Sequence, residues 1–138
     1  MSFFVYNRTV KLADTDAAGV VYFASILTFC HDAYEEMLAA SGISLRSWAE
    51  EETAIFPIVH SSLDCLGPMV WGDRLSIRAK VLQLRDRSFE MSYEVVAESA
   101  PEVLLATATT RHVCLDPRSR QKRVLPEAIA HALRAIAS

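Results

Sequence analysis

The stretch DTDAAGVVYF, residues 14–23, decides the fold, because a strand pattern ends in it and a helix pattern begins in it. Before it, apolar residues alternate with polar ones, and after it they recur every three to four positions, as on one face of a helix. The apolar helical stripe consists of Phe23, Ile26, Leu27, Cys30, Ala33, Tyr34, Met37 and Leu38. Ser41-Gly42 ends this pattern, since glycine is favoured just after a helix. The sequence therefore predicts a long helix that is entered through an acidic, glycine-containing loop.

The segments around this helix predict a sheet. The N-terminal strand is expected to turn Phe4, Tyr6, Val10 and Leu12 to one face, with Arg8 as an interruption. Beyond the helix, Ser44–Glu51 predicts a short second helix capped by Ser44, with Trp48 facing inward, and strand-like segments then continue to Leu115.

The later connections favour an antiparallel arrangement. Turn residues break the strand-like region into four strands with short connections, as in antiparallel sheets. After it, Pro126 is expected to open a C-terminal helix. One long helix beside such a sheet is an α+β arrangement, and its wide apolar surface predicts that the sheet curls around it. No linker or repeat divides the chain, so residues 1–138 are expected to form a single domain.

Composition restricts the class of protein. The formal charge of −3 favours neither nucleic acid nor acidic membranes as partners. The longest apolar run, from Ala17 to Leu27, is too short to span a bilayer, and the N-terminus predicts a strand and no signal peptide. Three cysteines without a Cys-x-x-Cys pair indicate reduced thiols in a cytoplasmic protein.

The motif Asp-x-Asp-x-x-Gly in residues 14–19 resembles the active-site segment of the 4-hydroxybenzoyl-CoA thioesterase family, which has the hotdog fold. Further matching pieces are Cys30–Glu35, Pro57–His60, Gly72–Leu75 and His112–Cys114. These pieces are similar to the subgroup that hydrolyses 1,4-dihydroxy-2-naphthoyl-CoA in phylloquinone biosynthesis. The resemblance implies hydrolysis of an aromatic acyl-CoA to the free acid and CoA by a homotetramer built as a dimer of dimers. It implies no cofactor, since coenzyme A is part of the substrate.

Asp16 is the candidate catalytic residue. A carboxylate just before a long helix lies close to backbone amides that have no partner inside that helix. A docked thioester carbonyl would place its developing oxyanion on the N–H groups near Tyr22 and Phe23, and one such donor is worth about 3–4 kcal/mol. Asp16 would then attack the carbonyl carbon or activate a water. Gly19 would permit an unusual backbone shape or a close ligand approach, and Asp14 is expected to hold the turn.

The helix and one strand supply candidate substrate contacts. His31 lies about two helical turns after Phe23 and shares its face, where Leu27 and Tyr34 would add apolar wall. In the hydroxybenzoyl relatives a helix carboxylate near this place meets the ring hydroxyl, so a histidine here implies a different hydroxylated ring. The resemblance also places His60 and Ser61 beside the site, across a dimer interface. Each histidine, His112 included, is alternatively an ordinary core or surface residue.

The phosphates of CoA predict a basic rim. Its candidates are Arg85, Arg87, Arg118, Arg120 and Lys122, in two turns that are alternatively solvated loops. The sequence contains no metal-ligand motif, serine elbow or dinucleotide loop, so no metal site is expected. Three functions remain open: a thioesterase for a CoA or carrier-protein ester, an acyl-binding module without turnover, and a dehydratase, which normally needs a histidine in the tunnel.

Overall fold

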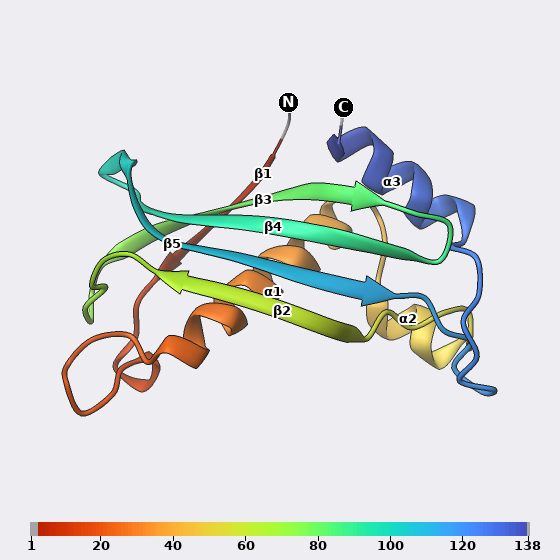
Figure 1. Cartoon of the computed structure of the whole chain (residues 1–138), viewed down its shortest axis with the longest axis horizontal. Helices are drawn as coiled ribbons and strands as arrows, with labels where there is room; N and C mark the ends of the chain where they lie inside the picture. The colour runs from red at the N-terminus through yellow and green to blue at the C-terminus, as the bar shows by residue number, and fades with distance from the viewer. Residues whose placement is uncertain (1–2, 138) are drawn as a thin grey trace.

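The computed structural model describes residues 3–137 (Figure 1). The helices are α1 (Phe23–Ala40), α2 (Leu45–Glu50) and α3 (Glu127–Ala137), and a 3₁₀ turn covers Leu12–Asp14. The strands are β1 (Phe4–Thr9), β2 (Ile58–Cys65), β3 (Arg74–Leu84), β4 (Ser88–Ala97) and β5 (Ala100–Val113). The predicted order of strand, long helix, short helix, four strands and final helix is confirmed.

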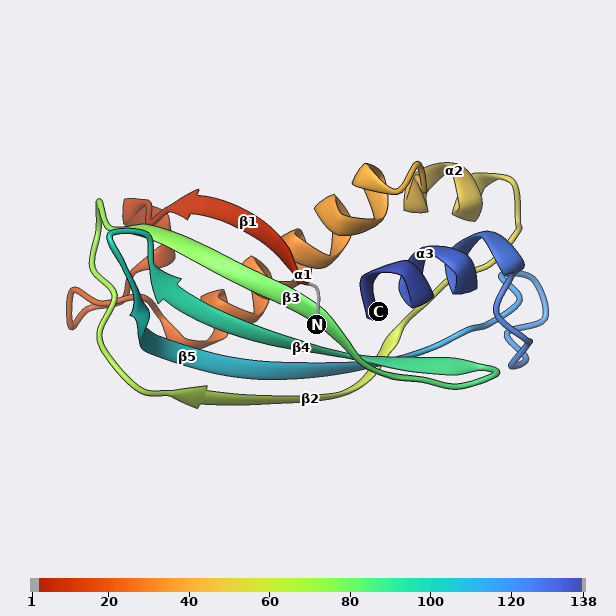
Figure 2. The same ribbon diagram turned by 90° about the horizontal axis from the view of Figure 1, so that it is seen from above.

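Within residues 3–137 the strands form one five-stranded sheet in the order β1-β3-β4-β5-β2, and all neighbours are antiparallel. The sheet curves along its length, and α1 lies against one of its faces, in contact with β1, β3 and β5 (Figures 1 and 2). This is the predicted α+β arrangement, an antiparallel sheet curled around one long helix. No helix in the described part of the chain combines the length and apolar character of a membrane span.

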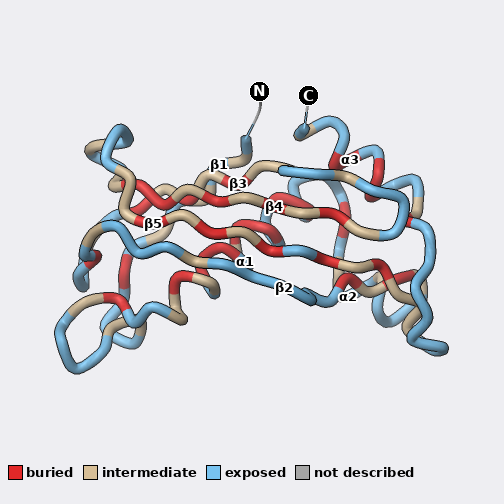
Figure 3. Tube along the Cα trace, in the orientation of Figure 1, coloured by how far each residue is buried: buried red, intermediate tan, exposed pale blue. Residues whose placement is uncertain are grey.

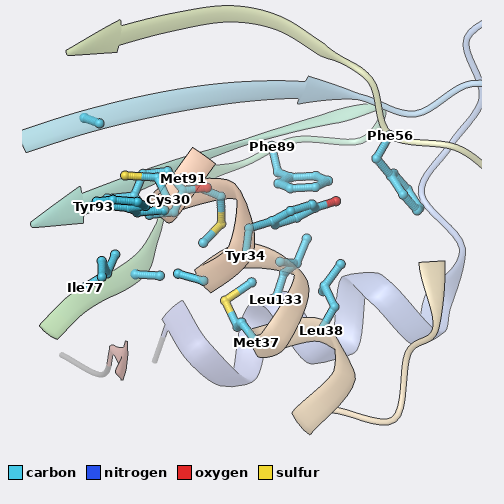
Figure 4. Close-up of a cluster of buried hydrophobic side chains, with 14 of the residues drawn as sticks. Cys30, Tyr34, Met37, Leu38, Phe56, Ile77, Phe89, Met91, Tyr93 and Leu133 are labelled. Atoms are coloured by element: carbon cyan, nitrogen blue, oxygen red, sulfur yellow. The ribbon is translucent and has the colours of Figure 1, made fainter. Parts of the chain in front are cut away.

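The core lies between α1 and the inner face of β3, β4 and β5. Alternation along these strands turns apolar residues toward the helix and polar residues outward, so that buried and half-buried positions alternate (Figure 3). Figure 4 shows side chains of this core, among them Cys30, Tyr34, Met37 and Leu38 of α1 and Ile77, Phe89, Met91 and Tyr93 of the sheet, with Leu133 of α3 beside them. Burial of each large apolar side chain contributes about 2 kcal/mol, so this layer stabilises the position of α1.

The burial of three residues before and within α1 differs from the sequence prediction. Leu12, expected on the inner face of the first strand, is 65% exposed, because β1 ends at Thr9 and the following 3₁₀ turn breaks the alternation. Phe23 is 59% exposed, since it is the first residue of α1 and lies at the open end of the sheet. Phe29, absent from the predicted stripe, is fully buried.

The far end of α1 agrees with the prediction. The helix ends at Ala40, and Gly42 follows with φ +82, a left-handed conformation that glycine adopts without strain. Ser44 then caps α2, its hydroxyl accepting the Ser47 N–H at 3.2 Å. Trp48 faces the protein and its ring lies 5.9 Å from that of Phe56.

Candidate active site

Residues 14–22 form a closed loop between β1 and α1. The Asp16 N–H donates to the Val20 carbonyl at 2.9 Å, and the Gly19 N–H donates back to the Asp16 carbonyl at 3.0 Å. Gly19 has φ +81, and a Cβ placed there would meet no other atom within 4 Å. The glycine is therefore required by the backbone shape, the first of its two predicted reasons, and the chain's own atoms do not crowd it.

The carboxylate of Asp16 is exposed at the turn of this loop. Its Oδ1 accepts the Ala18 N–H at 2.8 Å, which fixes the side chain as in an Asx turn. Within residues 3–137 no hydrogen bond engages Oδ2. One oxygen therefore orients the group and the other is open to an incoming ligand.

The predicted oxyanion donors separate into two cases. The Tyr22 N–H donates to the Asp14 carbonyl at 2.9 Å, so the expectation that it serves an oxyanion is wrong for this conformation. Phe23 opens α1, and its N–H finds no acceptor among the described residues, as expected for a first helical turn. Phe23 is therefore the available donor, at the positive end of the helix dipole.

Asp14 fixes the base of the loop, as predicted. Its carboxylate accepts two hydrogen bonds from the Arg8 guanidinium, at 3.0 and 3.1 Å, and the Lys11 N–H at 2.8 Å. Arg8 reaches it from the inner face of β1 and also contacts Asp32 on α1. In the sequence, only the cationic Arg8 on an otherwise apolar strand face indicates this role.

The candidate substrate contacts on α1 also separate. His31 is exposed, and Leu27 is half-buried. Tyr34, predicted to line the site, is only 1% exposed and is enclosed by the rings of Phe89 and His112. The structure therefore places Tyr34 in the core, and helix periodicity alone does not separate core positions from those that line an open slot. The His31 ring stacks near that of Tyr34, with centroids 5.6 Å apart, and so marks the outer limit of the core.

His112 belongs to the core. Its Nδ1 lies 3.2 Å from the Phe56 carbonyl and its Nε2 lies 2.9 Å from the Thr110 hydroxyl, which is itself 2.9 Å from the Tyr93 hydroxyl. Because a carbonyl only accepts, Nδ1 carries the proton and Nε2 accepts from Thr110. Burial lowers the pKa of His112 to about 4, which agrees with a neutral ring stacked 4.8 Å from Phe89.

His60 and Ser61 lie on β2, which forms one edge of the sheet, opposite β1. Apart from Leu63, every β2 residue is exposed. His60 pairs with Arg111 and Ser61 with Thr110, towards the end of β5. These two candidates therefore lie apart from the Asp16 loop of their own chain, on an edge that is open to another strand.

The two predicted basic turns meet. Arg85 and Arg87 lie in the β3–β4 turn, and the second group lies between β5 and α3. The turns are joined by hydrogen bonds from the Leu125 N–H to the Asp86 carbonyl and from the Cys114 N–H to the Arg87 carbonyl, both 2.9 Å.

The second turn is partly occupied by its own contacts. The Arg118 guanidinium lies 3.5 Å from the Glu52 carboxylate. The Arg120 backbone is in the left-handed region, with φ +60. Lys122 is exposed. Beside the first turn, a recess of about 190 Å³ is lined by Arg85 and by Arg111. Arg111 was not predicted, although alternation along β5 places it on the outer face.

The Asp16 loop and the basic turns lie at opposite ends of the sheet (Figures 1 and 2). The loop is tied to the β2–β3 connection by the Val21 N–H, which donates to the Met69 carbonyl at 2.8 Å. The basic turns follow the other end of β3. An 11-residue strand spans about 35 Å at ~3.3 Å per residue, so one chain does not bring both parts together.

Comparisons with known proteins agree on one family. The model of the thioesterase-like superfamily matches residues 10–133. A 1,4-dihydroxy-2-naphthoyl-CoA hydrolase of Nostoc punctiforme is 50% identical over 94% of this chain and 86% of its own length. That of Rippkaea orientalis is 46% identical over 94% of both chains.

A solved structure agrees as well. The crystal structure of a 1,4-dihydroxy-2-naphthoyl-CoA thioesterase from Synechocystis is 39% identical, with a TM-score of 0.91 over 96% of each chain. Sequence, fold and the Asp16 loop therefore lead to one conclusion: the chain belongs to the thioesterase-like superfamily.

Proposed function

We propose that this protein hydrolyses 1,4-dihydroxy-2-naphthoyl-CoA to 1,4-dihydroxy-2-naphthoate and CoA. The observation that carries the proposal is the loop of residues 14–22: among residues 3–137 nothing bonds to one Asp16 carboxylate oxygen or to the Phe23 N–H that follows at the start of a long helix. The relatives with that named activity cover nearly the whole chain at 40–50% identity. A carboxylate and an oxyanion donor are the two groups that acyl transfer requires.

In the proposed reaction the thioester carbonyl accepts the Phe23 N–H, which stabilises the negative charge that develops on its oxygen. By one route Asp16 attacks the carbonyl carbon, the C–S bond breaks, CoA leaves as the thiolate, and water hydrolyses the resulting anhydride. By the other, Asp16 takes a proton from a water that attacks directly. Rapid-quench mass spectrometry separates the two, because only the first forms an acyl group on Asp16.

The acyl group is proposed from the exposed face of α1 and from the relatives. A bicyclic ring needs apolar wall and a few polar contacts. Phe23 and Leu27 supply apolar surface, and the exposed His31 ring supplies a hydrogen-bonding group for a ring hydroxyl. A site built around such a hydroxyl rejects esters that lack it, since its polar group would stay unpaired.

We further propose that residues 1–138 act as one domain and assemble as a homotetramer of two dimers in the cytoplasm. Each open β2 edge is suited to pairing with another chain. If two β2 strands pair antiparallel about a twofold axis, the Asp16 end of one chain faces the basic-turn end of its partner. That arrangement would let Arg85 and Arg87 of a partner hold the CoA phosphates. The free cysteines among residues 3–137 support a reducing compartment.

The test is an assay of CoA release with 1,4-dihydroxy-2-naphthoyl-CoA, 4-hydroxybenzoyl-CoA and palmitoyl-CoA, with Asp16→Ala as the control for chemistry. We expect kcat/KM to fall in that order. A preference for palmitoyl-CoA would overturn the naphthoyl assignment and leave a thioesterase. Tight binding of the esters without any release of CoA would instead indicate an acyl-binding module.

A further inference from the structure

We propose that Arg8 is a positioning residue for thioester hydrolysis, which acts through Asp14 to hold the Asp16 loop against α1. This inference rests on the proposed function, in which the loop carries the catalytic carboxylate. The anchoring of the loop by Arg8 is tested without substrate, by hydrogen exchange. Arg8 does not touch the reacting groups. Its effect is on where the loop places them.

The contacts of Arg8 join three elements. From the inner face of β1, its Nη2 reaches both carboxylate oxygens of Asp14, at 3.0 and 3.1 Å, and its Nη1 reaches Asp32 Oδ2 on α1 at 3.3 Å. The guanidinium also lies 4.4 Å above the Phe29 ring, a favourable cation–π position. Only 18% of the Arg8 side chain and 13% of the Asp14 side chain are exposed, so solvent screens this pair weakly.

Asp14 passes this anchoring to both ends of the loop. Its carbonyl accepts the Tyr22 N–H at 2.9 Å, and Tyr22 directly precedes the proposed oxyanion donor Phe23. In the other direction, only one residue separates Asp14 from Asp16. A shift of Asp14 therefore moves the carboxylate and the N–H donor together. Misplacement of reacting groups by about 1 Å can cost about 100-fold in rate.

Charge makes Arg8 hard to replace. Without it, Asp14 and Asp32 would face the same half-buried space with no cation between them, and their repulsion would push the loop away from α1. The planar guanidinium contacts both carboxylates and the ring at once, whereas a lysine ammonium is a single point of charge. We therefore expect lysine to restore only part of the function.

The chain offers a matched control in Arg78 on β3. Its Nη2 lies 3.2 Å from Glu94 Oε1, it too lies over an aromatic ring, that of Phe3 at 5.7 Å, and its side chain is 25% exposed. Arg78 thus makes the same kinds of contact and is not linked to the loop. Arg8→Met and Arg78→Met each remove ion pairing and one cation–π contact from a largely buried side chain. A difference between the two variants therefore reports on the link to the loop.

The experiment measures steady-state kinetics with 1,4-dihydroxy-2-naphthoyl-CoA for both variants and for Arg8→Lys and Asp14→Asn. We expect Arg8→Met to lower kcat between about 10- and 100-fold with KM within about twofold, because in this proposal Arg8 acts through Asp14 and makes none of the binding contacts. Arg78→Met should stay within about twofold in both constants, and Arg8→Lys should recover part of kcat. The double variant Arg8→Met with Asp14→Asn should lose less than the product of the single losses, since both act through one contact.

A second readout needs no substrate. Amide hydrogen exchange at Asp16 and Tyr22, both bonded within the loop, should be faster in Arg8→Met than in Arg78→Met. Unchanged exchange, a kcat matching that of Arg78→Met, or a loss confined to KM would each overturn the role of Arg8. If Arg8→Met does not fold, Arg8→Lys carries the same comparison with a smaller expected loss. Wild-type protein that releases no CoA while exchange still responds to Arg8 would refute the proposed function and leave the loop anchor in place.

Discussion

Asp16 has one carboxylate oxygen bonded to the Ala18 amide and another that no described residue contacts by a hydrogen bond. Asp16→Asn therefore changes the chemistry of the group and keeps an acceptor for that amide. We expect turnover to fall by at least about 100-fold, the usual contribution of a general base or nucleophile, with an unchanged thermal midpoint. CoA release and calorimetry measure the two quantities. A loss below about tenfold, roughly 1.4 kcal/mol in barrier, would remove Asp16 from the catalytic role.

His31 should determine substrate preference more than rate. It is exposed on α1 and adjoins the core through Tyr34. We expect His31→Leu to narrow the ratio of kcat/KM between dihydroxynaphthoyl-CoA and palmitoyl-CoA, while activity on the aliphatic ester changes little, since that ester has no hydroxyl to pair. If His31→Leu kept the wild-type ratio of kcat/KM between the two esters, a group other than His31 would bind the ring hydroxyl.

His112 makes stability depend on pH. Its pKa is about 4 in the folded protein and about 6.5 when unfolded, so on acidification the unfolded chain takes up this proton first. The free energy of unfolding is therefore unaffected by protonation of His112 above about pH 6.5. It decreases as the pH falls toward 4, by about 3 kcal/mol in all.

Urea unfolding at pH 7.5 and pH 5.0, at one protein concentration, measures the larger part of this loss, about 2 kcal/mol. His112→Gln, which cannot take up the proton, should remove most of the difference, whereas the exposed His131→Gln should keep it. If the unfolding free energy changed equally between the two pH values in both variants, a group other than His112 would be responsible.

At the scale of elements, periodicity predicted what depends on neighbours along the chain. β3 and β4 each carry one polar and one apolar face, and α1 ends at the Ser41-Gly42 signal. Periodicity failed where partners are distant in sequence. Arg8 meets Asp32, 24 residues away, and the Tyr22 amide turns back to Asp14. Such pairings exist only after folding, so the anchoring of the loop could not be derived from the residues themselves.

The β3–β4 turn gives a prediction for binding. Replacing Arg85 and Arg87 by alanine should raise KM for CoA esters more than it lowers kcat, because phosphate contacts are remote from the carbonyl and bind ground and transition states alike. A truncated thioester without the nucleotide should be unaffected. Equal losses for both substrates would place the phosphates elsewhere.

At the scale of the whole molecule, the open β2 edge predicts association. We expect sedimentation velocity to find a tetramer, and Val59→Lys, which adds a charge to an exposed edge residue, to weaken it. Because the Asp16 loop and the basic turns of one chain lie at opposite ends, activity should fall with dissociation. A fully active monomer would contradict the shared site.

The strand order also sets a sequence of events in time. β3, β4 and β5 follow one another through short turns and pair as successive hairpins, whereas β2, among the described strands, has β5 as its sole neighbour, and β5 is the last of the five to be synthesised. On the ribosome, β2 must therefore wait without a partner while about 40 further residues emerge, and such non-local pairings form slowly. The hairpins and α1 would collapse first and β2 would dock last, so the edge proposed to join two chains would also be the last part of the sheet to form in each nascent chain.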